Sequence, residues 1–176
     1  MDRFMWPGGS EPRPTTNQNY PRMYGHNLCP FVARARYVFA CKEVPYQEVF
    51  VDLNEKAQWH LEFNGGMVPV LEAPTGELIP ESGIQVQYAL EAAPRSQGID
   101  LIPEDPITAA TMRFKIAEHD KNVLRKLFTM GLARFGNSEA NDVFCAEALP
   151  YMESLCPEVG SDKWLMGGDE ITLMDV

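Results

Sequence analysis

The stretch CPFVARAR, from Cys29 to Arg36, decides how this sequence is interpreted. Pro30 is suited to the first position of a helix, which leaves Cys29 at the positive end of the helix dipole. Amides at such an end stabilise an anion, and a thiolate is the reactive species in disulfide exchange. Arg34 and Arg36 add positive charge nearby. The pattern indicates a reactive cysteine, and a free cysteine packed as a small core residue is the competing interpretation.

Around the helix predicted over 30–42, the chain alternates between strand and helix patterns. Strands are predicted over 21–24, 46–52, 68–71 and 77–79, and further helices over 55–63 and 83–93. This order favours a mixed sheet with helices on both faces, which is the plan of an α/β thioredoxin-like domain. In that fold a proline opening the third strand is usually cis, and an extended peptide can pair with the backbone of Val68 beside it. The sequence alone leaves the isomer of Val68–Pro69 open.

After this domain, the apolar pattern becomes helical throughout. It predicts a long helix over 107–135 and a second over 138–156, which Pro150 should kink or split. The prediction for the whole chain is a flexible Pro-rich arm over 1–19, a thioredoxin-like domain over 20–94, a linker over 95–106 and an all-helical domain over 107–176.

Composition and charge argue against several classes of protein. The formal net charge of −10 disfavours nucleic-acid binding, and no apolar run approaches the roughly 20 residues of a membrane span, so no stable membrane insertion is expected. The amino end lacks the layout of a signal peptide, which favours a cytoplasmic location. Four cysteines without a C-x-x-C pair do not make a disulfide framework, and the three histidines lack zinc-ligand spacing. No metal site is therefore predicted.

Glu81 and Ser82 form a second feature at the start of the helix predicted over 83–93. A substrate carboxylate fits a helix N-terminus, where Ser82 can donate to it and Glu81 can pair with an ammonium group. Such a pair suits an α-amino-acid head group, as found on the γ-glutamyl end of glutathione. A plain serine cap with an acidic neighbour is the alternative.

Three motifs at these spacings resemble the omega-class glutathione transferases: Cys29–Arg36, VPVLE (Val68–Glu72) and GELIPES (Gly76–Ser82). Further similarity lies in Val44–Trp59, Leu101–Pro106 and Trp164–Asp175. The resemblance implies a thioredoxin-like domain followed by an all-α domain. Thr172 and Asp175 look like the box that starts the family's buried central helix, so the helical domain is expected to be truncated at Val176.

The resemblance also implies roles for individual residues. Cys29 would form a mixed disulfide with glutathione as co-substrate, and Lys56 would contact the glycyl carboxylate. Val68 would give two backbone hydrogen bonds to the cysteinyl unit, while Glu81 and Ser82 would hold the γ-glutamyl group. The implied activity is glutathione-dependent thiol transfer or reduction, including dehydroascorbate reduction, on a small thiol, disulfide or oxidised substrate, in a homodimer. A non-enzymatic relative, similar to chloride-intracellular-channel proteins or acting as a scaffold, stays open as the alternative.

Overall fold

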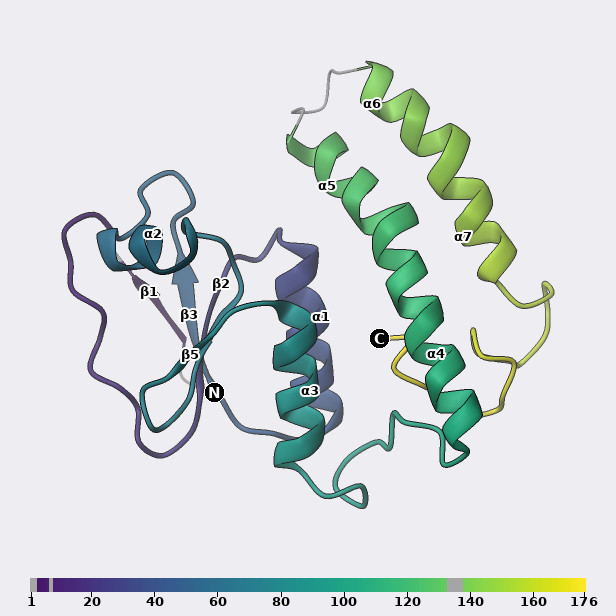
Figure 1. Cartoon of the computed structure of the whole chain (residues 1–176), viewed down its shortest axis with the longest axis horizontal. Helices are drawn as coiled ribbons and strands as arrows, with labels where there is room; N and C mark the ends of the chain where they lie inside the picture. The colour runs from purple at the N-terminus through teal and green to yellow at the C-terminus, as the bar shows by residue number, and fades with distance from the viewer. Residues whose placement is uncertain (1–2, 7, 133–137) are drawn as a thin grey trace. The chain divides into compact units, whose positions relative to one another are not determined.

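The chain divides into two compact units, Met1–Ile99 and Asp100–Val176. The structure is a computed structural model that describes residues 3–6, 8–132 and 138–176. Figure 1 follows the elements of both units along the chain. The division lies within the predicted linker over 95–106.

The first unit contains a five-stranded mixed sheet. Its strands are β1 (Arg3–Trp6), β2 (Arg22–Gly25), β3 (Gln47–Val51), β4 (Val70–Glu72) and β5 (Leu78–Ile79), in the order β1-β3-β2-β4-β5. The pairs β1–β3 and β2–β3 are parallel, whereas β4 is antiparallel to both β2 and β5. A parallel pair needs a crossover connection, which helix α1 (Pro30–Cys41) supplies between β2 and β3. The expected thioredoxin-like domain is confirmed.

Segment 1–19, expected as a loosely held arm, is attached to this sheet. Its first strand, β1, pairs with β3. Further along, the Thr16 hydroxyl donates to the Glu72 carboxylate at 2.7 Å, and the Arg22 guanidinium donates to the Thr15 carbonyl at 2.9 Å. The sequence did not indicate this attachment, because the pairing of β1 depends on β3, which lies far along the chain.

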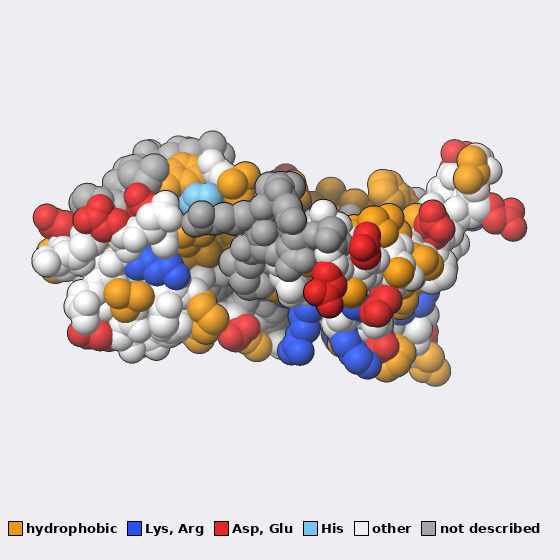
Figure 2. Space-filling view, turned by 90° about the horizontal axis from the view of Figure 1, so that it is seen from above, with side chains coloured by type: hydrophobic (Ala, Val, Ile, Leu, Met, Phe, Trp, Pro, Cys, Tyr) orange, Lys and Arg blue, Asp and Glu red, His pale blue; other side chains and the backbone are white. Residues whose placement is uncertain are grey.

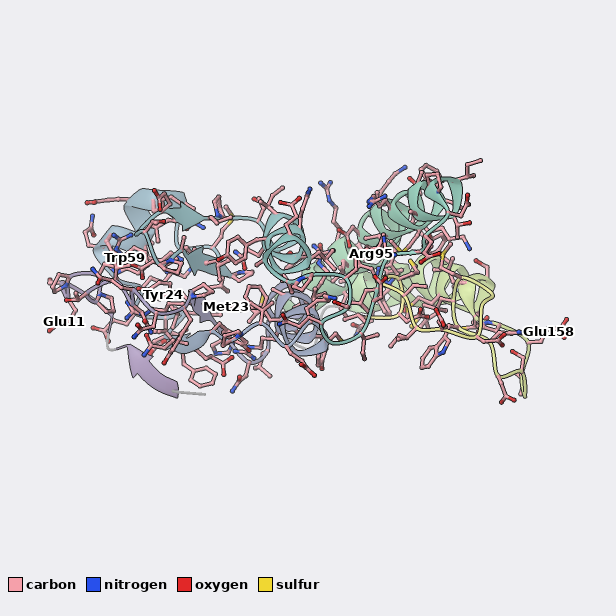
Figure 3. All side chains as sticks on the ribbon, turned by 90° about the horizontal axis from the view of Figure 1, so that it is seen from below. Glu11, Met23, Tyr24, Trp59, Arg95 and Glu158 are labelled. Atoms are coloured by element: carbon pink, nitrogen blue, oxygen red, sulfur yellow. The ribbon has the colours of Figure 1, made fainter. Side chains whose placement is uncertain are left out.

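Helices cover both faces of the sheet. Helix α1 packs beside α3 (Ser82–Ala92) on one face, and α2 (Gln58–Asn64) lies on the other, as Figure 1 shows. Because side chains alternate along a strand, Tyr24 faces α2 and Met23 faces away from it (Figure 3). The Tyr24 ring meets Trp59 of α2 edge to face at 5.0 Å. The core under α2 consists of Tyr24, Val49, Val51 and Val70.

A buried cluster of polar side chains lies beside this core. Glu72 accepts a hydrogen bond from the Tyr24 hydroxyl at 2.8 Å and pairs with Arg22 at 3.2 Å. Burial raises the pKa of Tyr24 above its ordinary value, so its hydroxyl stays protonated and acts as the donor.

The second unit consists of two helical series. The first runs through α4 (Pro106–His119), the π-turn η1 (Asp120–Leu124) and α5 (Arg125–Leu132); the second runs through α6 (Ser138–Val143), η2 (Phe144–Ala148) and α7 (Leu149–Leu155). The end of the helix predicted to 135 lies outside the described residues. Pro150 does not split its series: the π-turn η2 directly precedes α7. A wider turn absorbs the missing N–H and the clash of the proline ring.

Candidate functional site

Cys29 lies at the N-terminus of α1, as predicted. Its backbone is extended, with φ of −91° and ψ of 117°, and Pro30 occupies the first turn. The Cys29 carbonyl accepts from the Ala33 amide at 3.0 Å, which starts the helix. The thiol is free and half-buried. This position places its sulfur where the helix dipole stabilises negative charge.

The strand pairing brings Cys29 and Val68 together. Tyr24 of β2 lies opposite Val70 of antiparallel β4, so the end of β2 adjoins the start of β4. The Cys29 Sγ lies 3.7 Å from the Val68 carbonyl oxygen, and the Val68–Pro69 peptide bond is cis. Among the residues that the structure describes, no other hydrogen bond involves the Val68 backbone. The N–H of Val68 is therefore open to an extended ligand, and its C=O contacts the Cys29 thiol.

The start of α3 is linked to α1 by Arg34. Ser82 is 4% exposed, and its hydroxyl accepts from the Arg34 guanidinium at 2.7 Å. Glu81 before it is exposed and has a φ of +67°, a conformation that residues other than glycine rarely adopt. Backbone strain of this kind concentrates at functional sites.

Arg34 is a site residue whose partner the sequence did not indicate. The sequence suggested charge near Cys29, whereas the structure places the Arg34 guanidinium on Ser82. The other motif arginine, Arg36, donates to Asn27 at 3.0 Å and pairs with buried Glu48. Arg36 therefore braces the loop before Cys29. Only the packing of α1 against α3 and β3 separates the roles of the two arginines.

Lys56, in the segment before α2, approaches the loop that carries Gly66 and Val68. Its side chain lies over Gly66, because a Cβ added at Gly66 would come within 2.4 Å of Lys56 Cδ. Gly66 precedes Val68 by two residues and has a φ of +71°. Glycine at this position leaves room for the lysine, whose stem borders the loop that carries Val68.

Two of the predicted site residues are in direct contact, and the others are placed around them. The sulfur of Cys29 meets Val68, Lys56 borders the Val68 loop, and Ser82 is tied to α1 at the start of α3 next to Glu81. Lys56 and the Arg34–Ser82 pair suit carboxylates, and the Val68 backbone suits a peptide.

The described residues contain no group of three or more histidine, cysteine or acidic side chains placed to hold a metal ion. On the face in Figure 2, acidic side chains are spread over both units, and the basic ones visible there lie in separate small groups.

Within the described part of the chain, no helix is both long and apolar enough to cross a bilayer.

Comparison with known sequences shows similarity to glutathione transferases. The family described as glutathione S-transferase, N-terminal domain, matches residues 23–97. Glutathione S-transferase omega-1 of Sus scrofa is 36% identical over 106 residues, which cover 60% of this chain and 43% of that protein. The chain thus matches less than half the length of this relative.

Comparison with solved structures extends the similarity to both units. Glutathione transferase Omega 3C from Trametes versicolor has a TM-score of 0.70 at 24% identity, covering 88% of this chain and 64% of that one. A glutathione transferase homologue from Drosophila mojavensis, solved with bound glutathione, has a TM-score of 0.67 at 23% identity, covering 89% and 73%. These likenesses concern the fold, and they confirm the expected combination of a thioredoxin-like domain and a helical domain.

Proposed function

Because the first unit of this chain matches the N-terminal domain of the glutathione S-transferases and the chain is similar to omega-class relatives, we propose that it catalyses glutathione-dependent thiol transfer through a mixed disulfide at Cys29. The observation that carries the proposal is the position of the Cys29 sulfur, at the start of α1 and 3.7 Å from the Val68 carbonyl oxygen. A thiol at a helix N-terminus, beside a backbone N–H that has no partner among the described residues, can both react with a thiol-containing peptide and bind it.

Glutathione would lie along the Val68 backbone. Its cysteinyl unit would pair with the N–H and C=O of Val68, and its glycyl carboxylate would meet Lys56. Glu81 would take the γ-glutamyl ammonium, while Ser82 at the start of α3 would take the carboxylate. Arg34 supports this arrangement, because its guanidinium lies 2.7 Å from the Ser82 hydroxyl and adds positive charge there.

The proposed chemistry is two successive disulfide exchanges. The Cys29 thiolate attacks the glutathionyl sulfur of a substrate R–S–SG, so the S–S bond breaks, R–S⁻ leaves and takes up a proton, and Cys29–S–SG forms. A glutathione thiolate then attacks the glutathionyl sulfur of this mixed disulfide. Glutathione disulfide leaves and the Cys29 thiolate is restored. The net reaction converts R–S–SG and one glutathione into R–SH and glutathione disulfide.

Residue 32 supports this monothiol cycle. A dithiol mechanism places a second cysteine three residues after the first, and this chain has the buried Val32 there. Cys41, in the last turn of α1, does not occupy that position. Resolution of the mixed disulfide therefore falls to a second glutathione molecule. Dehydroascorbate, the other acceptor implied by the family resemblance, would be reduced with the same cysteine and with glutathione.

The experiment that tests this function compares Cys29→Ala with Cys41→Ala. Reduction of hydroxyethyl disulfide by glutathione should be lost in Cys29→Ala and retained in Cys41→Ala. Incubation with glutathione disulfide should add one glutathionyl group to the intact mass only where Cys29 is present. Full activity of Cys29→Ala would contradict the role of Cys29, whereas no glutathione-dependent turnover by the wild-type chain would favour a non-enzymatic relative.

The proposal also covers the context of the enzyme. The domain limits of 20–94 and 107–176, a homodimer and a cytoplasmic location are part of it, and the family resemblance supports them. Analytical ultracentrifugation tests the dimer. The chain matches 43% of the length of the omega-1 relative.

A further inference from the structure

The loop that carries Val68 is held in place by side chains from outside the loop. The Met67 carbonyl accepts from His60 Nε2 at 2.8 Å and from Asn64 Nδ2 at 3.0 Å, both on α2. On the other side of Val68, the Pro69 carbonyl accepts from Gln85 of α3 at 3.0 Å. The carbonyls of both residues flanking Val68 are thus anchored.

The anchored Met67 carbonyl determines where the Val68 amide points. A trans peptide group is planar, and its C=O and N–H point in opposite directions. Met67–Val68 is not among the cis bonds of the described chain. A carbonyl held towards α2 therefore directs the Val68 N–H away from α2.

His60 is the buried member of this anchor. Its side chain is 0% exposed. A carbonyl oxygen only accepts hydrogen bonds, so Nε2 must carry the proton. Within the described residues Nδ1 has no hydrogen-bond partner. The neutral Nε2–H tautomer thus satisfies the Met67 carbonyl, whereas a second proton would bury an unpaired N–H group.

We propose that His60 is a positioning residue for glutathione: it holds the Met67–Val68 peptide so that the Val68 N–H faces the site beside Cys29. The inference rests on the proposed function, because glutathione is the ligand whose cysteinyl unit would take this N–H. Asn64 shares the carbonyl, so removing His60 loosens the peptide without freeing it. Gln85 anchors the chain on the far side of Val68 in the same way.

The test uses three variants of the full chain. His60→Leu removes the donor, His60→Gln keeps an N–H donor at a similar reach, and Phe39→Leu is a stability control. Phe39 is fully buried and packs on Tyr46 and Tyr88, away from the loop. The probe is S-methylglutathione, which cannot form a disulfide with Cys29. Its affinity is measured by calorimetry, and the NMR shift of the Met67 carbonyl carbon, which moves when a hydrogen bond to that carbonyl is lost, is measured without ligand.

His60→Leu should weaken S-methylglutathione binding about fivefold to tenfold, the value of one net hydrogen bond, and should move the Met67 carbonyl shift. His60→Gln should recover most of the affinity and most of the wild-type Met67 carbonyl shift. Phe39→Leu should change neither quantity. Equal affinity of His60→Leu and wild type, or an equal loss in Phe39→Leu, would overturn the positioning role. If the wild type does not bind the probe, the proposed function fails, and an unchanged Met67 carbonyl shift in His60→Leu then overturns the anchor separately.

Discussion

Gly65 and Gly66 allow the contribution of Lys56 to glutathione binding to be separated from backbone strain. Both glycines have a left-handed φ, +72° and +71°. A Cβ on Gly66 would come within 2.4 Å of Lys56 Cδ and 3.2 Å of Leu61 Cδ2, whereas a Cβ on Gly65 meets nothing within 4 Å. Gly65→Ala is therefore a matched control for Gly66→Ala.

The two substitutions should have similar costs in stability and different effects on binding. Alanine in a left-handed conformation costs about 1–2 kcal/mol, so both variants should lose roughly that much unfolding free energy. Gly66→Ala must also displace the lysine side chain, which is flexible and yields easily. Losing one charge-assisted contact to a carboxylate at a partly exposed site amounts to about 0.5–1.5 kcal/mol, or about twofold to tenfold in affinity.

Urea unfolding and calorimetric titration with S-methylglutathione measure the two effects. Gly66→Ala should bind more weakly than Gly65→Ala by that factor, and Lys56→Met should bind as weakly as Gly66→Ala. The double variant of Lys56 and Gly66 should lose no further affinity, because both changes remove the same contact. Equal affinities of the two glycine variants would refute the contact between Lys56 and glutathione.

Other buried groups give further predictions for unfolding. Lys42 is 2% exposed and donates to the carbonyls of Pro94, Arg95 and Gln97, so Lys42→Met should cost about 2–4 kcal/mol in urea unfolding, while exposed Lys121→Met should change little. Glu72→Leu leaves Arg22 buried without its carboxylate and should cost about 3 kcal/mol or more by the same measurement, whereas unchanged stability would contradict the pairing. Burial lowers the pKa of His60, so the unfolded chain binds more protons below pH of about 6.5. The contribution of His60 to the free energy of unfolding is therefore complete above that pH and declines as the pH falls through it. The stability difference between wild type and His60→Leu should shrink over this range, and a constant difference would argue that His60 is not kept neutral.

Much of the first unit was predictable because its signals are local. The helix after Cys29, the strands at 47–51 and 70–72 and the hairpin before Ser82 all lie within a few residues of their predicted bounds. Strand β1 was missed because its pairing with β3 depends on a partner far along the chain. Pro150 was expected to disrupt a helix, and a π-turn accommodates it instead. A proline within a helical pattern indicates a steric conflict, but it does not indicate how the local backbone accommodates that conflict.

Some residues of the candidate site were predictable from the sequence, and the roles of others were not. Cys29, Val68, Glu81 and Ser82 stand out in the sequence because their chemistry depends on residue type and on position at a helix or strand end. The roles of Arg34 and His60 are different. Both depend on which atom lies opposite the side chain, namely the Ser82 hydroxyl and the Met67 carbonyl. Composition and periodicity carry no information about such opposing atoms.

The order of strands and helices from β2 to α3, the position of the reactive cysteine and the family motifs were therefore predictable from the sequence alone, since each depends on neighbours in sequence. Tertiary structure decided the rest. It set the cis state of Val68–Pro69, the 3.7 Å approach of Cys29 to Val68 and the separate partners of Arg34 and Arg36. These features arise where the antiparallel β2–β4 pair and the packing of α1 on α3 bring distant segments together, and packing distances between distant segments are not encoded in any local pattern.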